Sequence, residues 1–442
     1  MRLKTLTAAL AVALAATGLA ACGSGGGSDP KAITYWASNQ GPSLQRDKEI
    51  LTPELAEFTK QTGIAVKLEV IDWTHLLDRI TTATTSGDGP DVVNIGNTWS
   101  ASLQATGAFV DFDGPTLDEI GGQSKFLATS LRSTGAEGKT PTSVPLYGLS
   151  YGLFYNKKKF AAAGISTPPT NWTEFVADAK KLTNPAANTY GLSLAGGSYT
   201  ESAHFAFIFG KQHGGNFFDK AGSPTFATPQ NVAGVQQYLD LLGVDQVSIP
   251  SSAEHDTTQD ATADFTSGKA AMMMGQSNTT AYIAANGMAE SDYGIAPLPI
   301  EALLPPGAER VNSHVAGINI AAFKDKNTGA ALKFINFMTG KAEQVRLNQA
   351  YGSLPVTAEA AADPAFQVPT TKTFLDVLAN TSAPMPMVTN ESQFETTVGS
   401  ALKDLVAQIV GGKPVTAEAA ADPAFQVPTT KTFLDVLANT SA

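Results

Sequence analysis

The sequence predicts an α/β fold, and two observations carry this prediction. Short β-rich runs alternate along the chain with helical segments, which is typical of a sheet whose strands are joined by crossover helices. The chain also has 442 residues, of which 43% are apolar and 16% are charged. This length and composition suit a globular protein of two or three domains and exclude a coiled coil or a disordered chain.

The first hundred residues show the alternation most clearly. Strands are predicted at 33–36, 64–71 and 91–96. Between the first two strands, Thr52 is expected to cap a helix that has Pro53 in its first turn and ends at Gly63. A second helix is expected at 74–86. No G-x-G-x-x-G follows the first strand, so a dinucleotide cofactor is not expected.

Charge and cysteine usage exclude further classes of function. The chain has 40 acidic and 29 basic residues, a net charge of −11. Such a charge repels phosphate backbones, so nucleic acid is not an expected partner. The single cysteine has no disulfide partner and no second thiolate for a metal site. The five histidines are dispersed and none forms His-Glu-x-x-His, so neither a metal nor any other cofactor is expected.

The N-terminus has the pattern of a targeting segment. Two basic residues precede an apolar stretch that ends in Leu19-Ala20-Ala21-Cys22, and this ending resembles the lipobox of bacterial lipoproteins. Residues 1–21 are thus expected to be a signal peptide, Cys22 the site of lipid attachment, and 22–30 a flexible tether. We expect an extracytoplasmic protein that is held by lipid on the outer face of the bacterial cell membrane.

Side chains suited to a sugar lie at the ends of three predicted strands. They are Trp36, Ser38, Asn39 and Gln40, then Trp73, then Asn97, Thr98 and Trp99. Ligands of open α/β sheets bind at the carboxyl ends of the strands. Indole faces stack on the C–H faces of sugar rings, and amides and hydroxyls pair with sugar hydroxyls. The pattern predicts a carbohydrate site, with core packing as the alternative for any single tryptophan.

Four motifs, in their order and spacing, resemble the extracellular solute-binding proteins of ABC importers, specifically the maltose-binding-like sugar group. They are Ser86-Gly87-Asp88-Gly89-Pro90-Asp91-Val92-Val93, Gly152-Leu153-Phe154-Tyr155-Asn156-Lys157, Asn171-Trp172-Thr173-Glu174-Phe175 and Gly352-Ser353-Leu354-Pro355-Val356. The resemblance covers roughly residues 31–412. It implies two α/β lobes joined by a hinge, with a ligand cleft between them. Lobe one is expected at 31–146 plus 295–341, and lobe two at 147–294 plus 342–412.

The resemblance also implies further ligand-binding positions. They are Ser150 and Tyr151 on the crossover loop, His204 and Phe207 on an aromatic platform, Gln276 and Ser277 after a strand, and His314 and Gly317 on a late loop. The loop Gln276-Ser277-Asn278 lacks a tryptophan that the family often carries there, which weakens the case for a long stacked oligosaccharide. The implied mechanism is binding without catalysis. A monomer captures a sugar or short oligosaccharide, its lobes close, and it docks on the membrane permease.

Three alternatives stay open on the sequence. A peptide or amino-acid receptor would need a charged anchor for the ligand termini, and Asp72 is the candidate. Residues 148–152 satisfy the G-x-S-x-G pattern of serine hydrolases, with Ser150 as nucleophile. That motif requires a helix after the serine, whereas the residues that follow predict a strand. A lipoprotein adhesin would share the lipid anchor but would need no buried cleft.

The C-terminus contains a perfect internal repeat. Residues 355–383 recur without a change at 414–442. One repeat pair does not make a solenoid, which needs at least three stacked units. Two copies in different surroundings should diverge, so their identity indicates a recent duplication or an assembly error. Segment 413–442 is therefore expected to be a tail that ligand binding does not require.

Overall fold

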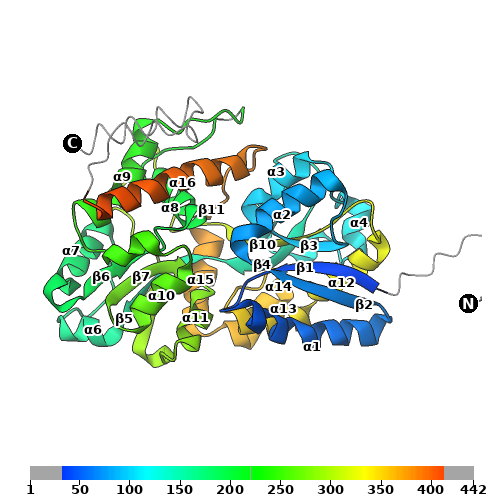
Figure 1. Cartoon of the computed structure of the whole chain (residues 1–442), viewed down its shortest axis with the longest axis horizontal. Helices are drawn as coiled ribbons and strands as arrows, with labels where there is room; N and C mark the ends of the chain where they lie inside the picture. The colour runs from blue at the N-terminus through cyan, green and yellow to red at the C-terminus, as the bar shows by residue number, and fades with distance from the viewer. Residues whose placement is uncertain (1–31, 220, 413–442) are drawn as a thin grey trace, which may run out of the picture.

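Two α/β lobes lie side by side in the protein (Figure 1). The structure is a computed structural model and describes residues 32–219 and 221–412. The predicted signal peptide, Cys22, the tether at 22–30 and the repeat copy at 414–442 lie outside the described residues. The predicted two-lobe α/β fold is confirmed.

The first lobe is built on a five-stranded sheet with the order β2-β1-β3-β10-β4. Its strands are β1 (Ala32–Ser38), β2 (Ala65–Ile71), β3 (Val92–Gly96), β4 (Val144–Leu149) and β10 (Ala316–Ala322). Strand β1 runs parallel to β2 and β3, whereas β10 is antiparallel to β3 and β4. The three strands predicted in the first hundred residues are confirmed as β1, β2 and β3.

Helices cover this sheet and connect its strands (Figure 1). They are α1 (Leu44–Thr62), α2 (Trp73–Ser86), α3 (Ser100–Ala105), α4 (Gly114–Glu119), α5 (Ala128–Leu131), α12 (Thr328–Met338), α13 (Lys341–Tyr351) and α14 (Ala358–Ala361), with the 3-10 helices η1 (Asn97–Trp99) and η2 (Gln123–Lys125). Helix α2 confirms the helix predicted at 74–86. Its C-cap Gly87 has a φ of 77°, a left-handed conformation that glycine adopts without strain.

The start of α1 differs from the prediction. The helix begins at Leu44, and the side chain of its N-cap Ser43 accepts a hydrogen bond from the Arg46 amide at 3.1 Å. Thr52 therefore lies inside the helix, and Pro53 also lies inside, where a proline removes one backbone hydrogen bond. Burial of the apolar face of α1 against the sheet offsets that loss. The predicted end at Gly63 is confirmed, with a φ of 74°.

The second lobe has a four-stranded sheet with the order β6-β7-β5-β8. Its strands are β5 (Tyr151–Asn156), β6 (Tyr190–Ser193), β7 (Ala270–Gln276) and β8 (Tyr293–Ala296). Its helices are α6 (Lys157–Ala162), α7 (Trp172–Leu182), α8 (Tyr199–Gln212), α9 (Pro229–Gly243), α10 (Thr258–Thr266), α11 (Thr279–Ala285), α15 (Pro369–Asn380) and α16 (Glu391–Val410), with η3 (Pro185–Ala187), η4 (Pro250–Glu254), η5 (Glu290–Asp292) and η6 (Pro364–Phe366).

Sheet membership places several segments on the other side of the predicted lobe boundaries. Strand β4 continues to Leu149 within the first sheet, and β8 pairs with β5 in the second. Helix α13 packs in the first lobe, because its residues Leu347 and Tyr351 belong to the hydrophobic core of that lobe. The chain crosses between the lobes at Ser150, at β9 (Ser313–His314) and between α14 and α15. The short strand β11 (Ser382–Ala383) pairs with β9 in parallel.

Helices α8, α9 and α16 pack closely together in the second lobe. Gly399 of α16 lies against the Tyr199 carbonyl of α8, so that a Cβ at position 399 would overlap it. Gly234 of α9 also lies close to the backbone of α8 at Gly210, so that a Cβ at position 234 would overlap it. This packing fixes the position of α8, whose first turns face the other lobe. Within the described ranges, no helix has the length and apolarity that crossing a membrane requires.

Candidate functional site

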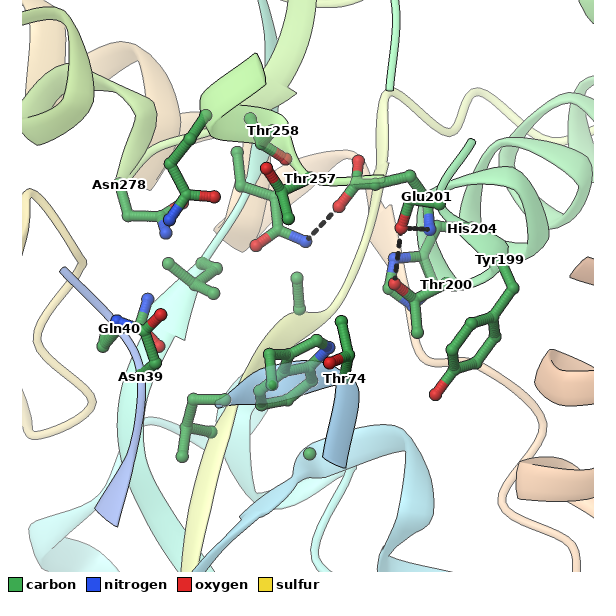
Figure 2. A pocket seen from close by; sticks show the side chains of 18 of the residues that line it. Asn39, Gln40, Thr74, Tyr199, Thr200, Glu201, His204, Thr257, Thr258 and Asn278 are labelled. Atoms are coloured by element: carbon green, nitrogen blue, oxygen red, sulfur yellow. Dashed lines mark hydrogen bonds between the residues drawn. The ribbon is translucent and has the colours of Figure 1, made fainter. Parts of the chain in front are cut away.

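A cavity of about 560 Å³ lies between the two lobes. On the first lobe it is lined by loops that follow β1 and β3 and by the start of α2. On the second it is lined by the first turns of α8 and α10 and by the loop after β7 (Figure 2). The cavity thus lies at the carboxyl ends of the first-lobe strands, where open α/β sheets bind their ligands. Its volume lies within the ~300–1,000 Å³ typical of small-molecule sites.

The loop after β1 is held in place by a buried carboxylate. Asp47 of α1 is fully buried and accepts hydrogen bonds from the amides of Gly41 at 2.8 Å and Gln40 at 3.2 Å. It also accepts one from the side-chain amide of Asn39. Burial raises the pKa of Asp47 to about 6, although these hydrogen bonds act in the opposite direction. Asp47 therefore positions Asn39 and Gln40 at the cavity wall.

The wall on the second lobe starts at the N-terminus of α8. The side chain of Ser198 caps the helix, and Tyr199, Thr200, Glu201 and His204 follow on the face toward the cavity (Figure 2). Thr257 and Thr258 supply hydroxyls at the start of α10, and Asn278 follows β7. The wall is therefore rich in hydroxyl, amide and carboxylate groups, which are suited to polar ligands.

A buried hydrogen-bond network connects both lobes at the back of this wall. The Trp99 indole N–H donates to Glu395 Oε2 at 2.8 Å, and Glu395 Oε1 lies 3.1 Å from His204 Nε2. His204 Nδ1 lies 2.8 Å from the Tyr151 hydroxyl, to which Gln276 donates at 2.9 Å. Every bond is satisfied when His204 Nε2 carries the proton, because it then donates to Glu395 while Nδ1 accepts from Tyr151.

The carboxylates in this region have different environments. Burial raises the pKa of Glu395, but hydrogen bonds, first among them that of His204, outweigh it and leave the pKa below its ordinary value. Burial raises the pKa of Glu201, against the influence of His204 and Tyr151. Burial is the main cause that holds the pKa of His314 well below its usual range, so its imidazole is neutral near neutral pH.

Comparison with known proteins identifies the family. A sequence model of the bacterial extracellular solute-binding proteins matches residues 41–345. The chain belongs to this family.

Individual relatives agree with this assignment. A binding protein of Brucella abortus is 28% identical over 335 residues, which make up 74% of this chain and 76% of that protein. The diacetylchitobiose binding protein DasA of Streptomyces coelicolor is 25% identical over 370 residues, 80% of this chain and 82% of that protein. Maltose-bound MalE3 of T. maritima has a TM-score of 0.76 at 20% identity, covering 92% of this chain and 99% of that chain. The predicted resemblance to maltose-binding-like solute-binding proteins is confirmed.

In this solute-binding protein, nine of the predicted ligand residues line the cavity. They are Asn39, Gln40, Trp73, Asn97, Thr98, His204, Gln276, His314 and Gly317. The structure therefore brings together residues from three strand ends of the first lobe, from α8 and β7 of the second, and from the segment that crosses between them. A role of each in ligand contact stays a prediction.

The other seven predicted residues lie outside the lining. They are Trp36, Ser38, Trp99, Ser150, Tyr151, Phe207 and Ser277. Trp99 is fully buried, and its ring stacks on Trp73 with the centroids 4.8 Å apart. The Arg79 guanidinium lies 4.4 Å from the centre of the Trp36 ring. Tyr151 supports the lining from behind, through its contacts with His204 and Gln276.

Several lining residues were not predicted. They include Tyr199, Thr200, Glu201, Thr257, Thr258, Asn278, Tyr282, Glu395 and Lys403. Asp72, the candidate anchor of a peptide or amino-acid receptor, also lines the cavity. A local signal exists for those at helix starts, because Ser198 and Thr257 are N-caps, and Thr257 forms a capping box with Asp260. Glu395 lies within the first two turns of α16, and nothing in its sequence neighbourhood marks it.

The structure gives no support to the hydrolase pattern. Ser150 lies between β4 and β5, so a strand follows it where a nucleophile elbow requires a helix. The residue is fully buried. In the described ranges, no group of three or more His, Cys, Asp or Glu side chains could hold a metal ion. The family and the fold are those of transport solute-binding proteins.

Proposed function

We propose that this solute-binding protein captures a sugar or short oligosaccharide in the interlobe cavity and delivers it to the permease of an ABC importer. The observation that carries the proposal is the combination of Trp73 with a dense polar lining in a cavity formed by both lobes. An indole stacks on a sugar ring, while amides, hydroxyls and carboxylates pair with its hydroxyl groups. Two of the similar proteins are named for, or bound to, disaccharides.

Contacts between the lobes support a closing mechanism. The Tyr282 hydroxyl of α11 donates to the Gln40 carbonyl at 3.2 Å on one side of the cavity. Trp99 of η1 donates to Glu395 of α16 on another. A ligand that contacts both lobes favours the arrangement in which such bridging contacts form, because it binds that arrangement more tightly than an open one.

The lining weighs against the peptide or amino-acid alternative. Such ligands carry a carboxylate that needs a cation. Among the described residues that line the cavity, no arginine is present, and Lys403 already pairs with Asp256 at 2.8 Å. A sugar without a carboxylate needs no such cation in the site.

The remaining parts of the proposal concern location. The lipobox-like ending at Cys22 supports a lipoprotein held on the outer face of the cell membrane, and the family is extracellular. A lipid anchor of this kind keeps the loaded receptor close to the permease. Labelling of cells with a radioactive fatty acid tests the anchor, since Cys22→Ala should abolish incorporation.

Isothermal titration calorimetry of the purified full-length protein with mono-, di- and trisaccharides tests the function. Trp73→Ala should weaken the binding of the preferred sugar by about two- to tenfold, because an aromatic contact contributes ~0.5–1.5 kcal/mol beyond area burial. Trp36→Ala is the matched control, since Trp36 lies outside the cavity lining. Equal losses in both variants, or binding of peptides in place of sugars, would contradict the proposal.

A further inference from the structure

We propose that the sugar bound in this cavity carries a protonated amine and that Glu201 is its counter-ion. The inference rests on the proposed function and narrows its substrate class from sugars in general to amino sugars.

The charge of the cavity lining is the first argument. Among the residues that the structure describes, four carboxylates line it, namely those of Asp72, Glu201, Asp256 and Glu395. The one lysine among the described lining residues is Lys403, which pairs with Asp256 at 2.8 Å. The cavity therefore repels phosphorylated sugars and sugar acids and attracts cations, because like charges disfavour each other in an enclosed site of low dielectric constant.

Glu201 is the lining carboxylate with the least compensation. It is 8% exposed. Gln276 donates to one of its oxygens at 3.5 Å, and the neighbouring His204 offsets only part of the effect of burial on its pKa. By contrast, Glu395 is bonded to both Trp99 and His204. No lysine or arginine of the described residues pairs with Glu201, and a buried carboxylate without a counter-ion is costly. An ammonium group of the ligand would supply that missing charge.

A second, independent observation indicates that a polar ligand enters here. His314 lines the same cavity and is only 1% exposed, yet neither of its ring nitrogens has a hydrogen-bond partner among the described residues. Its ring lies next to that of His204, with the centroids 4.1 Å apart. A neutral imidazole offers one donor and one acceptor, which match a sugar hydroxyl. The site thus presents, side by side, a partner for a hydroxyl group and a carboxylate that no described lysine or arginine pairs with.

Pairs of sugars that differ only in the amine provide the test. Cellobiose, its diamino counterpart (the chitosan dimer) and N,N′-diacetylchitobiose share one backbone, and the pairs glucose with glucosamine and galactose with galactosamine extend the set. Titration calorimetry of the full-length protein near neutral pH should show at least about tenfold tighter binding of an amine-bearing member than of its neutral partners. The preference should decrease with added salt, because screening weakens charge pairs.

Glu201→Gln removes the negative charge of the side chain and keeps its size, so the variant tests the charge alone. The variant should lose most of the preference for the amine while retaining some binding of the neutral partner. Glu174→Gln, on the exposed start of α7, removes the same charge outside the cavity and should leave the preference intact. Equal or tighter binding of a neutral sugar, or a preference that survives in Glu201→Gln, would overturn the inference and leave the proposed function standing. Binding of no sugar in the set would overturn both.

Discussion

Replacement of Asp47 by asparagine should remove a specific pH dependence from the stability of the protein. The Asp47 carboxylate is fully buried, and burial raises its pKa from 3.8 to about 6. A carboxyl group whose pKa is higher in the folded state stabilises that state when protonated. Its contribution is therefore fully present below about pH 3.8 and is lost as the pH rises through about 6.

The size of this effect follows from the two pKa values. Their difference corresponds to about 3 kcal/mol at the low-pH limit, since one pKa unit equals ~1.36 kcal/mol. Between about pH 4.5 and about pH 7.5, the contribution changes by about 2 kcal/mol. Asparagine does not titrate. The free energy of unfolding of the wild type, minus that of Asp47→Asn, should thus be about 2 kcal/mol larger at the lower pH.

Urea denaturation at both pH values measures this difference directly. The comparison between the two proteins cancels other titrating groups, such as Glu343, whose pKa burial raises to about 8. A difference that is the same at both pH values would refute the reasoning, because Asp47 would then titrate alike in the folded and unfolded states. Asp47→Asn should also weaken ligand binding at both pH values, since Asn39 and Gln40 depend on its carboxylate for their position.

Three further predictions concern packing and the tail. Gly399→Ala should lower the free energy of unfolding by ~1–3 kcal/mol, because the added methyl overlaps the backbone of α8 at Tyr199. The control Gly329→Ala, with no heavy atom within 4 Å, should lose nothing; equal losses in urea denaturation would contradict the packing argument. Trp99→Phe removes the donor to Glu395 and should cost ~1.5–3 kcal/mol in the same assay, and an unchanged midpoint would show that the bond contributes nothing. Truncation after Gly412 should leave the calorimetric affinity for sugar unchanged, since the described lining residues lie within 39–403, and a folded truncation that loses affinity would show that the tail takes part.

Local signals in the sequence predict much of the fold. Strands β1, β2 and β3 follow from their apolar runs, and the helix ends at Gly63 and Gly87 follow from the need for a left-handed residue. The predicted start of α1 was wrong because both Ser43 and Thr52 have a side-chain hydroxyl that can cap a helix N-terminus. Which of them caps the helix depends on how far the helix packs along the sheet, and tertiary contacts decide this.

In the candidate site, too, local signals predict some residues, whereas tertiary contacts decide the position of others. The strand ends of the first lobe brought Asn39, Trp73 and Asn97 to the cavity, because the ends of neighbouring strands meet at one edge of a sheet. Glu395 reaches His204 across 191 positions of sequence only because α16 packs on α8. Trp99 looked equivalent to Trp73 in the sequence, but the 3-10 turn after β3 places its ring in the core.

A thermal-shift measurement shows whether the interlobe cavity binds a sugar. The full-length protein is heated with saturating mono-, di- and trisaccharides, amino acids or short peptides in separate samples. A ligand that binds only the folded protein stabilises it by about 2.7 kcal/mol at a hundredfold excess over Kd. The unfolding midpoint should rise with one class of sugar, and the rise should be smaller in Trp73→Ala. A midpoint that rises only with peptides or amino acids, or that rises with none of the compounds, would contradict sugar binding in this cavity.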